Sequence, residues 1–344
     1  MFTVAALAAG LSACKSADKG SPDSPRMRTD LVFRAVGDTT DVSGRLVIAP
    51  APHGGIYVGA QTTSGLVEEL DSTGRFVRNI GRLGEGPGEY RAPTAILTRG
   101  DVLWIWDRNG VRSQFTADGV FLGAVSTSIW EASRTLLLRG DTMIVARPTQ
   151  PTIGEAPHPL QVVAPDGAVV RAFGGELDAS TSSWSARLRS LARDSDSTFW
   201  AANFYRYTLE HWTVGGALLR RLTPSRAWFP PDGQQSGNVW EDRPTPMVLG
   251  IRADGDGHLL VRLRRARADL KAGMHEGRGM VAVEESMRYI EIVVEVIDAT
   301  TGKLLKEMVQ HDNPILWFLD DGRVAGIETD ESGRQIPVVW RLIH

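Results

Sequence analysis

Two kinds of short polar turn alternate along the chain, and each separates two apolar runs. Glycine takes the positive φ that a tight hairpin turn requires, so a turn of this kind between apolar runs predicts a β-hairpin. The first kind lies at Gly55, Gly100, Gly140, Asp196, Gly257 and Gly322, and the second at Gly74, Gly119, Gly167, Gly216 and Gly302. The runs between them are rich in β-branched and aromatic residues, which favours strands.

The turns group into six repeats. Two hairpin turns per repeat give four strands, and six repeats of four antiparallel strands predict an all-β fold, the six-bladed β-propeller. The last repeat has only three strands, ending in IPVVWRLIH. The run DLVFRAV, from Asp30 to Val36, precedes the first complete blade. We expect it to add the missing outer strand and close the ring. Only Glu276 to Tyr289 has the spacing of a short helix.

Composition limits the classes of partner. The formal net charge is −3 over 344 residues, which gives no general attraction to nucleic acid or to an acidic membrane surface. The single cysteine, Cys14, cannot form an internal disulfide or a multi-cysteine zinc site. We expect a monomer that does not bind nucleic acid.

The position of Cys14 is informative. The sequence MFTVAALAAGLSAC places it after an apolar run that is too short to span a bilayer but suits an export signal. The residues LSAC resemble the lipobox of bacterial lipoproteins, although no Lys or Arg precedes the apolar run. The resemblance implies a signal peptide over residues 1–13 and lipidation of Cys14. Residues 14–29 are polar and predict a flexible tether, followed by a propeller over 30–344. Lys15 after the cysteine favours the outer membrane.

The glycine-rich stretch IGRLGEGPGEYRAPTAI, residues 80–96, invites comparison with a phosphate-binding loop. Such a loop needs Gly-Lys-Ser/Thr leading into a helix, whereas a strand-like run follows here, so we expect a turn between blades. With Tyr90, Pro93, Asp107, Arg112, Gln114 and Phe115, the stretch resembles an NHL repeat. The resemblance implies a six-bladed propeller of the bacterial lipoprotein type. It does not specify a function, because propellers host both binding and catalysis.

The long connections point to a binding surface. In a blade with strands A to D, the B–C and D–A loops share one face, and the expected long connections, 148–159, 174–187, 223–246 and 264–288, all belong to it. Aromatic and basic residues gather there, as in many binding surfaces: Trp184, Trp228, Phe229, Trp240, Arg264, Arg265 and Arg267. The alternative is that the tryptophans pack against blade edges. The opposite face, made of short turns, should be plain.

A second candidate site is the channel mouth, where each D–A loop enters an inner strand. The residues expected there are Asp41, Arg91, Glu131, Arg187, Arg243 and Asp312. Propeller lactonases place carboxylates at this point around a divalent cation, but the arginines here would repel one. A salt-bridged ring and a site for a carboxylate or phosphate both fit this composition. No HExxH or GxSxG motif occurs, and only His311 lies near the mouth. We expect no metal, no cofactor and no catalytic residue.

Three functional hypotheses remain. The first is an exported, lipid-anchored module that binds a small ligand or a protein through its long-loop face. The second is a metal-dependent hydrolase or lyase of the lactonase type, and the third is a structural subunit of an envelope complex. In every case the largest insertion, residues 264–288, should be removable without loss of the fold.

Overall fold

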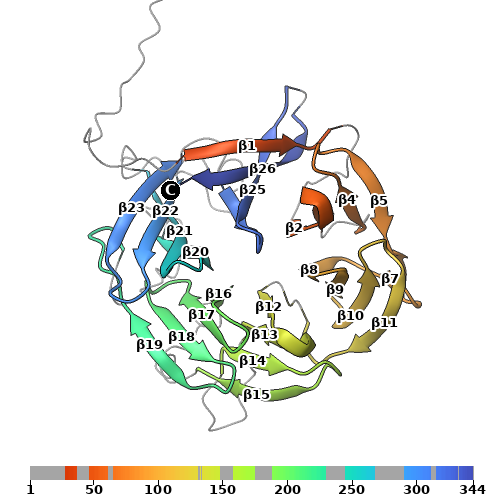
Figure 1. The fold of residues 1–344 in the computed structure, drawn as a ribbon, viewed down its shortest axis with the longest axis horizontal. Coiled ribbons are helices and arrows are strands. Elements are labelled where there is room, and N and C mark those ends of the chain that lie inside the picture. The colour runs from red at the N-terminus through yellow and green to blue at the C-terminus, as the bar shows by residue number, and fades with distance from the viewer. Residues whose placement is uncertain are drawn as a thin grey trace, which may run out of the picture.

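The computed structural model describes residues 28–36, 46–60, 65–130, 132, 134–147, 158–174, 188–229, 245–267, 290–310, 315–331 and 333–343. Six four-stranded antiparallel sheets are arranged in a ring around a central axis (Figure 1). The predicted six-bladed propeller is therefore confirmed. The described part of the chain contains no α-helix, only two short 3-10 turns, η1 (Pro52–Gly54) and η2 (Arg139–Asp141). The expected helix within 276–289 lies outside the described residues.

Each blade runs from an inner strand near the central axis to an outer strand at the rim. Blade one consists of β2 (Leu46–Pro50), β3 (Ile56–Ala60), β4 (Val67–Leu70) and β5 (Phe76–Ile80). Blade two consists of β8 (Pro93–Arg99), β9 (Val102–Asp107), β10 (Val111–Thr116) and β11 (Phe121–Ser126). Blade three consists of β12 (Thr135–Leu137), β13 (Met143–Val145), β14 (Leu160–Val163) and β15 (Val169–Phe173). Blade four consists of β16 (Arg189–Arg193), β17 (Thr198–Asn203), β18 (Leu209–Thr213) and β19 (Leu218–Leu222). Blade five consists of β20 (Met247–Ala253), β21 (His258–Ala266), β22 (Ile290–Asp298) and β23 (Leu304–Gln310).

The two ends of the chain build blade six together. Its inner strands are β24 (Ile315–Phe318), β25 (Arg323–Thr329) and β26 (Gln335–Ile343), and its outer strand is β1 (Arg28–Arg34). The β1–β26 ladder is antiparallel and runs from Arg28 opposite Ile343 to Arg34 opposite Val338. This confirms the predicted ring closure. The strand begins at Arg28, within the segment expected to be tether.

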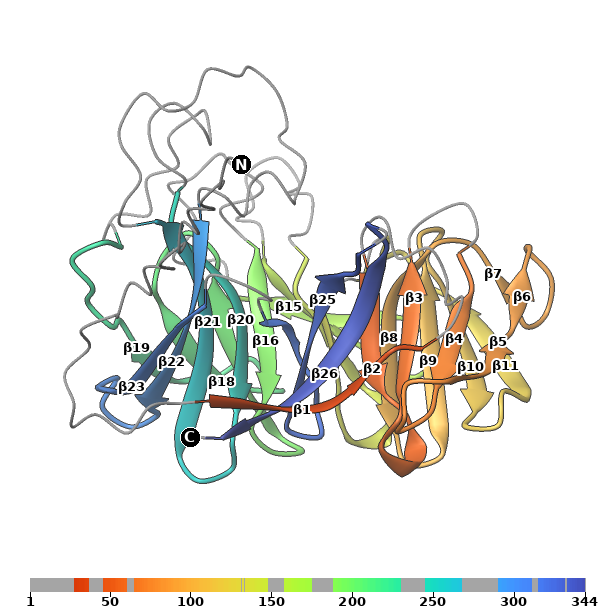
Figure 2. The same cartoon turned by 90° about the horizontal axis from the view of Figure 1, so that it is seen from above.

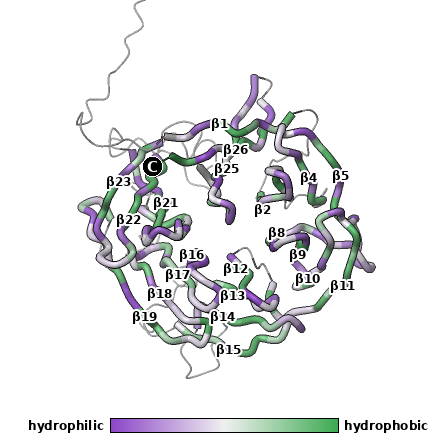
Figure 3. The backbone as a smooth tube through the Cα atoms, in the orientation of Figure 1, coloured by the Kyte–Doolittle hydropathy of each residue, from purple (hydrophilic) through white to green (hydrophobic). Residues whose placement is uncertain are grey.

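The apolar core is divided among the six seams between blades. The seam between blades one and two, for example, buries Val67 and Ile80 of one blade against Ile105 and Phe115 of the other. The outer strands are covered on one side only, and Figure 3 shows apolar segments along β11 and β15 at the rim. Because every blade contributes to two seams, each depends on both neighbours for burial of its apolar side chains.

Each turn between the third and fourth strands lies against the outer strand of the preceding blade. A Cβ at Gly74 would lie 2.0 Å from the carbonyl oxygen of Arg34, and one at Gly167 would lie 2.6 Å from the side chain of Val125. Both glycines also have positive φ, 82° and 86°. Glycine is therefore required there for the turn and for the close approach of two blades.

Ring closure yields a first prediction. Phe33 of β1 is 5% exposed and packs with Val339 and Leu46, so Phe33→Ala should lower the free energy of unfolding by about 3–5 kcal/mol. Leu31 on the same strand is 47% exposed, and Leu31→Ala should change it by less than about 1 kcal/mol. Denaturant unfolding measures both values. Equal effects of the two variants would show that β1 does not close the core.

Candidate functional site

The long connections start and end on one face of the ring. The longest ones, residues 146–159, 174–188, 223–246 and 267–289, join second to third strands or one blade to the next. The turns on the opposite face, between first and second or third and fourth strands, have at most five residues. In Figure 2 the short turns close the lower edge of the ring. We call the two sides the long-loop face and the short-turn face.

Several residues expected to form a site lie outside the described part of the chain. They are Asp41, Glu131, Arg187, Arg243 and Asp312 of the expected channel ring, together with His311, Trp184 and Trp240. The structure does place Arg91, Trp228, Arg264 and Arg265. These four do not form one cluster, because Arg91 belongs to the connection between blades one and two and the others to blade five and the connection that enters it.

The glycine-rich stretch is a connection between blades, as expected. It joins β5 to β8 and contains a small parallel pair, β6 (Arg82–Leu83) and β7 (Glu89–Tyr90). The buried Tyr90 links this connection to blade one. Its phenol donates a hydrogen bond to the carbonyl oxygen of Ile80 at 2.5 Å and accepts one from the backbone N–H of Val67 at 2.7 Å. Arg91 is 63% exposed and lies 3.4 Å from the exposed Glu85. This is a solvated surface ion pair.

The expected start of the largest insertion is wrong. Arg264 and Arg265 belong to β21, where they pair with Ile292 and Glu291 of β22. The ladder with β22 extends to Ala266, which pairs with Ile290, before the connection begins. Excision from Arg264 would remove part of this ladder. A deletion that spares the strands must be confined to residues 268–289.

Arg265 takes part in a compact group with Trp228. Its Nε lies 2.5 Å from an Oε1 of the nearly buried Glu291, and its guanidinium lies 5.1 Å from the ring centroid of Trp228. Trp228 itself packs against the core at the seam of blades four and five. The packing interpretation of Trp228 therefore has direct support, while part of the ring remains accessible.

A buried ion pair fastens the segment that leads to Trp228. Arg226 donates from Nε and Nη2 to the two carboxylate oxygens of Glu295, each at 2.7 Å. Glu295 is fully buried on β22 and also accepts from the Tyr207 hydroxyl at 2.5 Å. Burial and the Glu295 carboxylate raise the pKa of Tyr207 well above its usual value, so the phenol stays protonated and donates. Sequence patterns gave no signal for this triad, because its members come from three separate elements.

Arg264 differs from these arginines in its contacts. Its Nη2 donates to the carbonyl oxygen of Thr245 at 3.3 Å and lies against the sulfur of Met247. Its Nε is buried without a hydrogen-bond partner. Burial lowers the pKa of Arg264, and the Tyr205 phenol opposes the shift. Among the described residues, no carboxylate forms an ion pair with Arg264.

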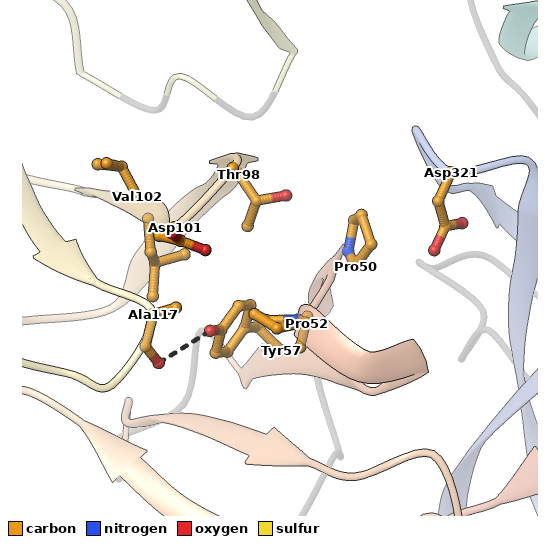
Figure 4. A pocket seen from close by; sticks show the side chains of 11 residues that line it. Pro50, Pro52, Tyr57, Thr98, Asp101, Val102, Ala117 and Asp321 are labelled. Atoms are coloured by element: carbon orange, nitrogen blue, oxygen red, sulfur yellow. Dashed lines mark hydrogen bonds between the residues drawn. The ribbon is translucent and has the colours of Figure 1, made fainter.

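The short-turn face is not plain. A cavity of about 310 Å³ lies there at the seam of blades one and two. Figure 4 shows Pro50 and Pro52 of the first turn, Tyr57 of β3, Thr98 and Asp101 of blade two, and Asp321 of blade six around it. The expectation was wrong because the cavity forms between neighbouring blades, whereas the sequence reveals only the length of each turn.

Two polar side chains that line this cavity, Tyr57 and Asp321, form hydrogen bonds within the protein. Tyr57 donates to the carbonyl oxygen of Ala117 at 3.2 Å, and burial raises the pKa of Tyr57 to about 12. Asp321 accepts from Arg323 Nε at 2.7 Å, and Arg323 Nη2 donates onward to the Gly55 carbonyl oxygen at 2.7 Å. The cavity suits a small polar group. Its charged lining residues are two carboxylates, Asp101 and Asp321.

Over the described ranges, no three His, Cys, Asp or Glu side chains are placed to hold a metal ion. The described histidines have local roles instead. His211 stacks on Trp200 with ring centroids 4.5 Å apart and lies 3.0 Å from Asp194, while His258 lies 2.8 Å from Asp254. Likewise, within the described part of the chain, no helix is long and apolar enough to cross a membrane.

Comparison with known proteins supports the fold. No protein-family model and no curated protein matches the chain. A crystal structure of a "putative exported protein" from Bacteroides fragilis matches with a TM-score of 0.62 at 11% identity, covering 92% of this chain and 96% of that one. A member of the DUF4221 family from Bacteroides vulgatus matches with a TM-score of 0.59 at 10% identity, covering 93% and 99%. At such identities the similarity establishes the propeller fold alone.

The buried triad yields a second prediction. Glu295→Ala leaves Arg226 without its partner and should lower the free energy of unfolding by about 3–5 kcal/mol. Asp118 is a suitable control, because it is 85% exposed and lies 3.5 Å from Arg78. Asp118→Ala should change the free energy by less than about 1 kcal/mol. Denaturant unfolding checks both, and a cost for Glu295→Ala as small as the control would contradict the anchoring role of the triad.

Proposed function

We propose that the chain is an exported, lipid-anchored β-propeller that binds a small ligand or a protein partner through its long-loop face. The observation that carries the proposal is the asymmetry of the ring, with all the longest connections on one face and turns of at most five residues on the other. Long loops held by a rigid scaffold are where binding surfaces usually form. The protein would act as a monomer with no cofactor.

The path of the chain gives the proposed orientation. β1 begins at Arg28, opposite Ile343 near the end of β26, on the side of the short turns (Figure 2). A tether from a lipidated Cys14 would join the propeller there. The short-turn face and its cavity would then lie toward the membrane, and the long-loop face would point away from it.

Two kinds of evidence support export. The N-terminal sequence resembles a lipoprotein signal with Cys14 at the modified position. A crystal structure that matches this chain over 92% of its residues, and over 96% of the residues of the matched chain, carries the description of a putative exported protein. The outer membrane remains the favoured site, on the ground that Lys15 follows the cysteine.

Anchoring is tested with Cys14→Ala in a bacterial host that processes lipoproteins. We expect the wild-type chain in the membrane fraction and the variant in the soluble fraction, because a lipid anchor supplies the apolar surface that holds the domain. Mass spectrometry of the wild-type chain should show acyl groups on Cys14. An unmodified Cys14, or an unchanged distribution of the variant, would refute the anchor.

Orientation is tested with fluorophores on two turns of blade two. Asn109 is exposed on the long-loop face, and Asp118 is exposed on the short-turn face. In lipid vesicles carrying a headgroup quencher, a label on Asp118→Cys should be quenched more strongly than one on Asn109→Cys. The reverse order would invert the proposed orientation.

Binding itself is tested on an array of defined peptides and glycans. Replacing residues 268–289 by a short Gly-Ser turn should remove signals seen with the wild-type chain. Asp118→Ala, on the other face, should keep them. Signals that survive the loop replacement would argue against the long-loop face.

A further inference from the structure

Arg264 lies where blade five meets the channel on the long-loop face. Its guanidinium reaches Thr245, just before the inner strand β20, and Met247, the first residue of that strand. The Tyr205 phenol, in the connection between β17 and β18 of blade four, is close enough to influence its charge. Met247 is the first residue of the innermost strand of its blade. Arg264 therefore lies at the upper inner edge of the ring.

Within the described part of the chain, no carboxylate pairs with the positive charge of Arg264. Its contacts are a backbone carbonyl and a thioether, and its Nε is buried without a hydrogen-bond partner. A buried guanidinium without a carboxylate is costly, because desolvation is not offset by an ion pair. The side chain as a whole is only half-buried, so an incoming group can still reach the guanidinium.

Four other arginines of blades four to six have a carboxylate partner. Arg226 and Arg265 bind Glu295 and Glu291 at 2.7 and 2.5 Å. Arg221 lies 3.2 Å from Glu210, and Arg323 lies 2.6 Å from Asp321. Other interior arginines donate to backbone carbonyl oxygens instead, as Arg252 does to Gly322 and Arg193 does to Leu137. Arg264 belongs to this second group, and its Nε is in addition buried without a hydrogen-bond partner.

A second cation lies beside it. Arg262 is two residues earlier on β21, so its side chain projects from the same face of the strand. Arg262 Nη2 donates to the carbonyl oxygen of Leu249 at 3.2 Å, and burial lowers its pKa to about 9. The register of β20 shifts between Val248 and Gly250, and Gly250 has no side chain to fill the space beside the Arg262 guanidinium. Arg262 therefore reaches the backbone of the innermost strand, while Arg264 reaches the carbonyl oxygen of Thr245, just before that strand begins.

We propose that Arg264, with Arg262 beside it, forms an oxyanion site at the inner edge of blade five that receives a carboxylate or phosphate group of the ligand. A guanidinium offers parallel N–H donors that match the oxygens of either group. The proposal rests on the proposed function, because it names the chemical group that the long-loop face would recognise. It places that group near the channel.

The test is thermal unfolding of the full chain carrying Cys14→Ala, in sodium chloride, sodium acetate or sodium phosphate at matched ionic strength. An anion that binds the folded state and not the unfolded state raises the melting temperature. We expect a rise of about 2–5 °C near saturation in acetate or in phosphate. A rise in acetate only identifies a carboxylate site, and a rise in phosphate only identifies a phosphate site. No rise beyond the chloride reference would overturn the proposal.

Variants locate the effect. Arg264→Met should abolish the anion-dependent rise, while its melting temperature in chloride should be unchanged or higher, because an uncompensated charge has been replaced by an apolar side chain. The control Arg220→Met removes an exposed arginine on β19 and should keep the anion effect. An anion effect that persists in Arg264→Met, or a drop in chloride as large as that of Arg226→Met, would refute the site.

The outcomes are separable from those of the proposed function. A chain that is anchored and oriented as proposed but shows no anion effect would lose only the oxyanion site. A chain that binds phosphate through Arg264 but keeps its array signals after loop replacement would lose the long-loop surface and keep the site.

Discussion

The pairing of β1 with β26 is the interaction on which the ring depends. Six blades bury their apolar side chains at six seams, and a missing outer strand in blade six would expose the seam that also involves blade one. Phe33 illustrates the point, because it comes from the N-terminal strand yet packs with residues of both blades. The closure joins residues more than three hundred positions apart, so the full ring forms only when nearly the whole chain is present.

Local turn chemistry explains why the fold was predictable from sequence. Gly74, Gly119, Gly167, Gly216 and Gly302 all have positive φ in the turns where hairpins were expected. The runs between them are rich in β-branched and aromatic residues, which favours strands, and the incomplete last repeat indicated the missing partner. The NHL resemblance remains a resemblance, since the structural neighbours support the propeller without specifying that repeat type.

The candidate site was much less predictable. Turn length could not reveal the cavity beside Tyr57, because three blades contribute to it. Arg264 and Arg265 are adjacent in sequence but differ completely in environment, one without a carboxylate and the other bound to Glu291. The difference arises from alternation along β21, which sends the two side chains to opposite faces, and from a glutamate on β22 that only the register identifies.

The contact between each third-to-fourth-strand turn and the preceding blade has a mechanical consequence. Gly74 rests on the backbone at Arg34, so the end of β1 is held by blade six along its ladder and by blade one at its tip. A pull at Arg28 runs along a strand whose hydrogen bonds lie across the direction of force and must rupture together. Tension from the N-terminal side would thus be shared between two blades before it reached the loops on the far face.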